Sequence, residues 1–184
     1  MKIKQILADV ARLLLKGELA DNLENNSSLS DEEKVDVKYL LHGYNIIQHE
    51  VASEYLSLLA EERKFGKEIA FADLSYFPIK IVSVCDDDGE KVPFTVREDK
   101  IKLDKDNWHT VRYRHAPNKK EQNDDFDYEN TKIGKRAFIY GTASEYCLMT
   151  GRYEDAANWR NKFEKAATSP LTRGKTKIKG RIWG

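Results

Sequence analysis

The chain has 184 residues, with 31 Lys and Arg against 31 Asp and Glu, so its formal net charge is zero. At ~150 residues per domain, this length predicts one domain, or one domain with an elaborated arm. The charge balance argues against a general nucleic-acid coat and against a polybasic membrane binder. No stretch approaches the ~20 apolar residues that cross a bilayer, and the first residues lack the apolar core of a signal peptide. We therefore expect a chain with no membrane contact.

Two helical patterns occupy the first third of the chain. Apolar residues recur every three or four positions from 2 to 16, which predicts an amphipathic helix. Residues 21–30 are rich in Asn, Asp and Ser, which hydrogen-bond their own backbone, and are interpreted as a loop. Ser30 and Glu33 have capping-box spacing and predict the start of a second helix. Its apolar face continues to Gly66, so this helix is expected to be unusually long, ~45–50 Å at 1.5 Å per residue.

The apolar period changes to two after Gly66, which is typical of β-strands. Short runs of β-branched and aromatic residues alternate with charged turns between 67 and 116. Asp88 and Gly89 suit a tight hairpin turn, because glycine adopts a positive φ without steric cost. This segment is predicted to be an antiparallel meander of about four strands.

A helical hairpin is predicted after an acidic segment. Residues 117–130 carry several carboxylates among asparagines, and this composition indicates a solvated loop or a contact for a basic partner. Helical period returns with a stripe of small residues that includes Ala137 and Gly141, and small side chains let helix axes approach closely. Gly151 is expected at the corner between this helix and the next one.

The C-terminal residues 170–184 form a basic segment without acidic residues. Because the residue before a proline disfavours the α region, Ser169 and Pro170 are predicted to end the last helix. The segment alternates basic with small or apolar residues, which indicates an extended arm. Three interpretations are open: a disordered tail, strand addition to another subunit with Trp183 as an anchor, and phosphate contact. The basic residues are Arg173, Lys175, Lys177, Lys179 and Arg181.

These elements predict an α+β fold built on a four-helix bundle whose second helix is long. The helical core would comprise residues 1–66 and 131–169, with an antiparallel β-subdomain inserted at 67–116. An acidic loop at 117–130 and an extended basic arm at 170–184 complete the predicted organisation.

No pattern in the sequence indicates catalysis or a bound cofactor. His42 and His49 are two helical turns apart, ~10 Å, which is too far for one metal ion. Cys85 and Cys147 lie in a predicted strand and a predicted helix without metal-ligand spacing, so they are interpreted as reduced packing residues. We therefore expect no catalytic residue, no cofactor and no metal, and the protein is not expected to be an enzyme.

The order of elements resembles a family of virion proteins. The features are a short helix, a long helix, a β-rich insertion ending near Tyr113-Arg114-His115-Ala116-Pro117, a glycine-cornered helical hairpin over 140–156, and a terminal Lys179-Gly180-Arg181-Ile182-Trp183. Together they are similar to head-to-tail adaptor proteins (connector or head-completion proteins) of tailed bacteriophages. The likeness extends over most of the chain.

This resemblance implies a structural protein of the virion head-tail junction, assembled in the host cytoplasm. Such proteins form a ring, commonly twelvefold, that docks under the portal protein, contacts tail or neck proteins and extends the channel for genomic DNA. Their C-terminal arm commonly reaches the portal. The resemblance therefore assigns portal docking to Lys175, Lys177, Lys179, Arg181, Ile182 and Trp183.

A second hypothesis is a DNA- or RNA-binding protein that uses the basic C-terminal arm together with Arg112 and Arg114 on the last predicted strand. Salt distinguishes the two hypotheses. Phosphate-driven binding to free duplex weakens steeply with ionic strength, whereas an adaptor should bind little free duplex at all.

Overall fold

The computed structural model describes residues 1–172, which form two compact units. One unit comprises Met1–Ile47 and the residues from Lys120 onward, and the other comprises Gln48–Lys119. The first is helical and the second is built from strands, so the α+β class is confirmed. The predicted docking residues, 175–183, lie outside the described residues.

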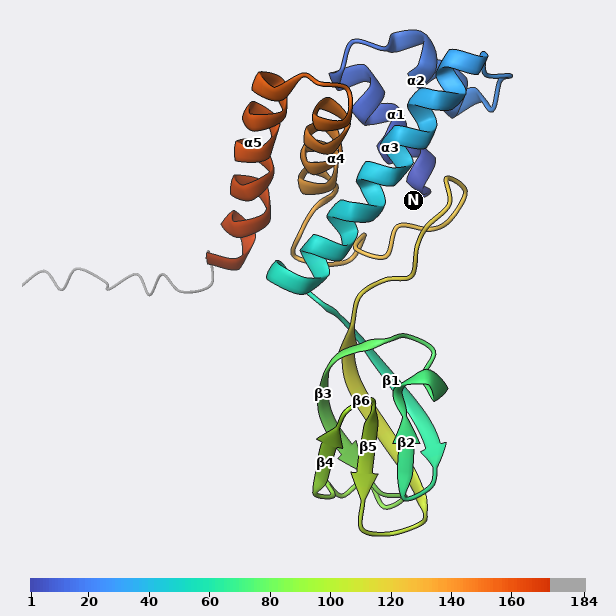
Figure 1. Ribbon diagram of the computed structural model, residues 1–184, viewed down its shortest axis with the longest axis vertical. Coiled ribbons are helices and arrows are strands. Elements are labelled where there is room, and N and C mark those ends of the chain that lie inside the picture. Colours follow the sequence, from blue (N-terminus) through green and yellow to red (C-terminus); the bar gives the residue numbers. More distant parts are fainter. Residues whose placement is uncertain (173–184) are drawn as a thin grey trace, which may run out of the picture. The chain divides into compact units, whose positions relative to one another are not determined.

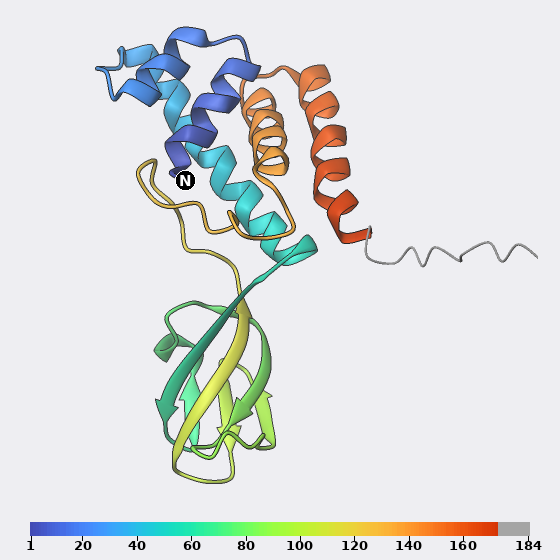
Figure 2. The ribbon, with the colours of Figure 1, turned by 180° about the vertical axis from the view of Figure 1, so that it is seen from behind.

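The helical unit contains α1 (Ile3–Leu13), α2 (Gly17–Asn25), α3 (Asp31–Glu50), α4 (Lys135–Met149) and α5 (Tyr153–Thr172). The described part thus has five helices where four were predicted, and the long helix is the third. In both views α4 lies between α3 and α5 (Figure 1 and Figure 2). The apolar stripe of α1 is buried as predicted, and it supplies Ile3, Ile6, Leu7 and Val10 to the core.

The loop prediction for residues 21–30 is wrong over its first half. Leu19, Ala20 and Leu23 are buried on one side of α2, and this burial stabilises a helix that the polar composition disfavours. The helix ends at Asn25, and the capping residue Asn26 adopts a left-handed φ of 53°. Asparagine tolerates that conformation better than most residues, so the Asn-rich sequence specifies the end of the helix and not its absence.

The start of α3 is as predicted, but its end is not. The Glu33 amide donates to Ser30 Oγ at 3.2 Å, and the Ser30 amide donates to Glu33 Oε2 at 2.8 Å, which forms the capping box. The helix stops at Glu50 and passes through a π-helical turn, Val51–Tyr55, into strand β1 (Leu58–Phe65). Pairing with a second strand overrides the strong helix propensity of Leu, Ala, Glu, Arg and Lys in this segment.

The β unit contains six strands in two antiparallel sheets. They are β1, β2 (Glu68–Ala70), β3 (Pro78–Cys85), β4 (Phe94–Arg97), β5 (Lys100–Leu103) and β6 (Trp108–His115). The strand order is β1-β6-β3 in one sheet and β2-β5-β4 in the other. The two sheets bury a common apolar core made by Ile69, Leu74, Val84, Ile101, Leu103, Val111 and Tyr113. The unit is therefore larger than the four-strand meander predicted for 67–116.

The turn after β3 follows the prediction. Gly89 has a φ of 81°, and Asp86 Oδ1 accepts from the amides of Asp88 and Glu90. The aspartate side chain therefore stabilises the turn that glycine permits.

The helix α5 runs through Ser169 and Pro170 to Thr172, so the predicted helix end at Pro170 is wrong. A proline costs a helix one amide donor and crowds the preceding turn. The helix nevertheless continues beyond the proline to Thr172, the last residue that the structure describes. Residues 170–172, which were predicted to begin the extended arm, are therefore helical, and the rest of the predicted arm lies outside the described residues.

The contact between α3 and α4 depends on the missing side chain of Gly141. A Cβ placed there would lie 2.8 Å from Cδ1 and Cγ2 of Ile47 and 2.9 Å from its Cγ1. On α3, a Cβ at Gly43 would lie 2.9 Å from the Glu145 Cβ. Each helix thus presents one glycine to the other, and each glycine lies directly against a side chain of the facing helix.

We expect Gly141→Ala to lower the free energy of unfolding by about 1–3 kcal/mol, because overpacking a close contact forces neighbours to move. Urea unfolding measures this change. Gly17→Ala is the matched control, since a Cβ at Gly17 meets no atom within 4 Å. In the double variant with Ile47→Ala, the loss caused by Gly141→Ala should largely disappear. An equal loss in both backgrounds would contradict the packing explanation.

Candidate functional site

The αα-hairpin that carried the family resemblance is formed as predicted by α4 and α5. Gly151 lies between the helices with a φ of 76°, a conformation that favours glycine. Ser144 Oγ donates to the Ala156 carbonyl at 2.9 Å across the hairpin, and the rings of Tyr140 and Trp159 stack with centroids 5.8 Å apart. The hairpin is therefore held by a buried hydrogen bond and by an aromatic contact.

The three predicted packing residues have different roles. Ala137 is buried in α4, and Gly151 permits the turn of the hairpin. Gly141, however, makes its closest approach to Ile47 on α3. The small-residue stripe therefore brings together α3 and α4 as well as the hairpin helices, a contact that the sequence spacing alone did not specify.

The acidic loop is attached to the first residues of the chain. The amides of Ile3 and Lys4 donate to the carbonyls of Asp124 and Gln122, at 2.9 and 2.8 Å. The ammonium of Lys2 lies 2.9 Å from Asp125, and that of Lys120 lies 2.8 Å from Asp127. Within the described residues, these carboxylates therefore have basic neighbours in the chain itself.

The expectation that this loop buries little is wrong. Phe126 and Tyr128 are 4% and 1% exposed, and their rings pack against Phe138 with centroids 4.8 and 4.9 Å apart. The acidic residues around them dominated the composition, but the two aromatic side chains at alternate positions point into the core. The loop is therefore a structural cover of the helical unit.

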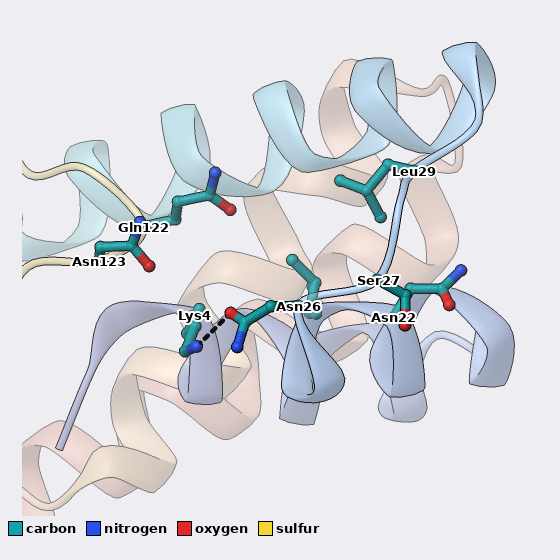
Figure 3. A pocket seen from close by; sticks show the side chains of 8 residues that line it. Lys4, Asn22, Asn26, Ser27, Leu29, Gln122 and Asn123 are labelled. Carbon is teal, nitrogen blue, oxygen red and sulfur yellow. Dashed lines mark hydrogen bonds between the residues drawn. The ribbon is translucent and has the colours of Figure 1, made fainter.

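A polar pocket of about 200 Å³ lies between α1, α2 and this loop (Figure 3). Lys4 Nζ donates to Asn26 Oδ1 at 2.5 Å inside it. The rest of its lining is mostly amide side chains, which hydrogen-bond but do not exchange protons near neutral pH. The lining residues are Lys4, Asn22, Leu23, Asn26, Ser27, Leu29, Gln122 and Asn123.

A charged network joins three elements of the helical unit. Lys16 Nζ lies 2.6 Å from Asp36 Oδ2, and the Tyr146 hydroxyl donates to Asp36 Oδ1 at 2.5 Å. The hydrogen bond with Asp36 raises the pKa of Lys16. Burial and the bond to Asp36 raise the pKa of Tyr146. Both groups thus keep their protons at neutral pH, and the network stabilises the junction of the α1–α2 corner with α3 and α4.

The β unit contains a second network, centred on the largely buried carboxylate of Glu62. The Tyr113 hydroxyl and the Ser75 amide both donate to Glu62 Oε1, and Lys64 Nζ lies 3.0 Å from Oε2. Burial opposes ionisation of Glu62, but the Tyr113 hydroxyl, the Ser75 amide and Lys64 together lower its pKa below the ordinary value of 4.5. This carboxylate thus stabilises the fold in its ionised form.

The outward surface of the sheet β1-β6-β3, here called the outer sheet face, carries both predicted basic residues of the second hypothesis. Arg112 pairs in register with Glu61, and Arg114 lies between Leu59 and Lys80. At the other end of the face, Phe65 lies opposite Trp108. The alternation of β6 leaves Arg112 and Arg114 exposed while His109, Val111, Tyr113 and His115 are buried.

In the part of the chain that the structure describes, no group of three or more His, Cys, Asp or Glu side chains is placed to hold a metal ion. Both cysteines are free, with Cys147 buried and Cys85 partly buried. No helix within residues 1–172 is both long and apolar enough to cross a membrane.

No family model matches the chain, and no curated protein matches it.

We expect the stability of the protein to fall as the pH drops below about 4.5. A carboxylate whose pKa is lowered on folding contributes stability above its unfolded pKa, and this contribution is lost as the pH falls through the folded value. Denaturant unfolding between pH 6 and pH 3 measures the dependence. Glu62→Gln and Tyr113→Phe should both flatten it, and an unchanged profile in both variants would contradict the role given to Glu62.

Proposed function

We propose that this chain is a structural virion protein, a ring-forming head-to-tail adaptor that docks under the portal protein and extends the DNA channel toward the tail. The proposal comes from the resemblance of the hairpin over 140–156 and of the terminal segment 179–183 to tailed-phage adaptors. Its partners would be the portal, tail or neck proteins, further copies of itself and the genomic DNA that passes through the ring. Its location would be the head-tail junction, after assembly in the host cytoplasm.

The observation that carries the proposal is the course of α5. This helix packs on α4, buries Ala156 and Phe163, and continues at least to Thr172. The basic segment 173–184, which contains Trp183, is therefore joined to a helix that is fixed to the core. An arm that transmits a docking force to its own subunit needs such a base, whereas a tail with only a solubilising role does not.

A row of exposed apolar side chains on α3 supports contact with neighbouring copies. Val35, Tyr39 and Ile46 are 51%, 39% and 38% exposed and follow one another at intervals of four and seven residues along one face. Ring closure needs two different surfaces that meet on adjacent copies, and a helix face of this kind is suited to one of them. Three partly exposed side chains are far fewer than the ~20–30 residues that each partner of a stable pair contributes. We therefore expect the free chain to be monomeric and to form a ring only on the portal.

The first test removes residues 173–184, which leaves α5 complete, and follows assembly with purified portal by native mass spectrometry. The full chain should be a monomer alone and should add to the portal in a fixed number of copies. The truncated chain should fail to bind while keeping the far-ultraviolet circular dichroism of the full chain. Unchanged assembly of the truncated chain would remove the arm from the docking mechanism.

The second test compares single residues of the arm. Trp183→Ala should weaken portal binding more than Lys175→Ala, because burial of an aromatic anchor usually outweighs one rim charge. Titration of each variant against immobilised portal gives the two dissociation constants. The reverse ranking would favour contact of the arm with phosphates and would count against a docking pocket for Trp183.

A further inference from the structure

The outer sheet face combines exposed aromatic rings with cationic side chains. Phe65 and Trp108 are 56% and 44% exposed, and their ring centroids are 5.4 Å apart in an edge-on arrangement. The guanidinium of Arg63 lies 5.1 Å from the centre of the Trp108 ring. Two neighbouring half-exposed rings on the solvent side of a sheet have no role in the core of the unit, which lies on the opposite side of the same strands.

The cationic residues continue this surface along the strands. Arg63, Arg112 and Arg114 occupy successive outward positions across β1 and β6, and Lys80 lies beside Arg114 on β3. Outward residues on one strand are about 6.6–6.8 Å apart, because every second residue faces the same side. The face therefore presents a row of cations that leads away from an aromatic end.

The acidic groups on this face do not cancel the cations. Arg112 Nε lies 3.5 Å from Glu61 Oε2, and Arg63 Nη2 lies 2.6 Å from Asp87 Oδ1. All four of these side chains are 44% exposed or more. Ion pairs of this kind contribute little and are readily exchanged for another anion. Arg114, in contrast, has a neutral partner among the described residues: its Nη1 donates to Ser57 Oγ at 3.5 Å.

We infer that the outer sheet face binds single-stranded nucleic acid, with Arg63, Arg112, Arg114 and Lys80 on the backbone phosphates and Trp108 and Phe65 against unpaired bases. Cationic side chains that follow the backbone and aromatic rings that stack on bases are the two components of sequence-tolerant single-strand binding. A duplex can use the cations but hides its base faces, so the exposed rings favour the single strand. This activity is independent of the proposed docking to a portal.

The test measures binding of a fluorescently labelled 15-nucleotide single strand to the full chain by anisotropy, at 50 to 200 mM salt. With four phosphate contacts, the slope of log affinity against log salt should reach about −3. The double variant Arg112→Ala and Arg114→Ala should reduce the slope to about half. Trp108→Ala should weaken binding roughly 5- to 100-fold at constant salt, and a duplex of the same length should bind more weakly than the single strand.

Two control variants test whether the single-stranded nucleic acid binds on the outer sheet face. Lys38→Ala removes an exposed cation from α3 and should leave binding unchanged, as should removal of residues 173–184. Each variant of the outer sheet face is first checked for wild-type thermal unfolding. If Trp108→Ala is unfolded, the double variant Arg112→Ala and Arg114→Ala tests the face in its place.

The inference is overturned by loss of binding only on removal of 173–184, by equal affinity for duplex and single strand, or by no binding at 50 mM salt. It is also overturned if the face variants instead alter only the self-association of the chain, which would make the face a protein interface.

Discussion

The close approach of α3 and α4 is the constraint on which the helical unit depends. Gly43 lies against the Glu145 Cβ and Gly141 against the Ile47 side chain, and interiors at native packing density leave little room for an added methyl group. Because α4 also forms the hairpin with α5, the same contact fixes the base of the C-terminal segment. The aromatic cluster of Tyr44, Phe126, Tyr128 and Phe138 then covers the core beside it. A loop whose composition is mostly polar is thereby part of the core of this unit.

The β unit separates its stabilising and its accessible charges by the alternation of its strands. Inward positions of β1 and β6 place Glu62 and Tyr113 in a buried network, whereas outward positions place Glu61, Arg112 and Arg114 in solvent. Of two adjacent residues on these strands, one therefore faces the interior of the unit and the other faces solvent. One register shift would exchange them, because the side-chain period of a strand is two. The pairing of β1 with β6 therefore decides which charges hold the unit together and which ones meet other molecules.

Much of the fold could be predicted from local patterns, and the errors have physical causes. The first helix, the capping box at Ser30, the turn at Gly89 and the hairpin at Gly151 were found because each depends on neighbours in sequence. The switch from α3 to β1 was missed because Leu58–Phe65 also satisfies a helical pattern, and only pairing with β6, far along the chain, selects the strand. The sequence pattern correctly placed Arg112 and Arg114 on the last strand, where both are exposed. Phe65 was assigned to a helix end, so its place beside Trp108 could not be foreseen.

The end of α5 also sets a length scale for any partner of the terminal segment. Trp183 is eleven positions beyond Thr172 in the sequence, and an extended chain advances at most ~3.3–3.6 Å per residue. The Cα of Trp183 can therefore lie no farther than about 40 Å from the Cα of Thr172. A pocket for the Trp183 side chain must therefore lie within the length of that side chain from this limit. The position of Thr172 thus restricts which part of a neighbouring molecule can hold the pocket.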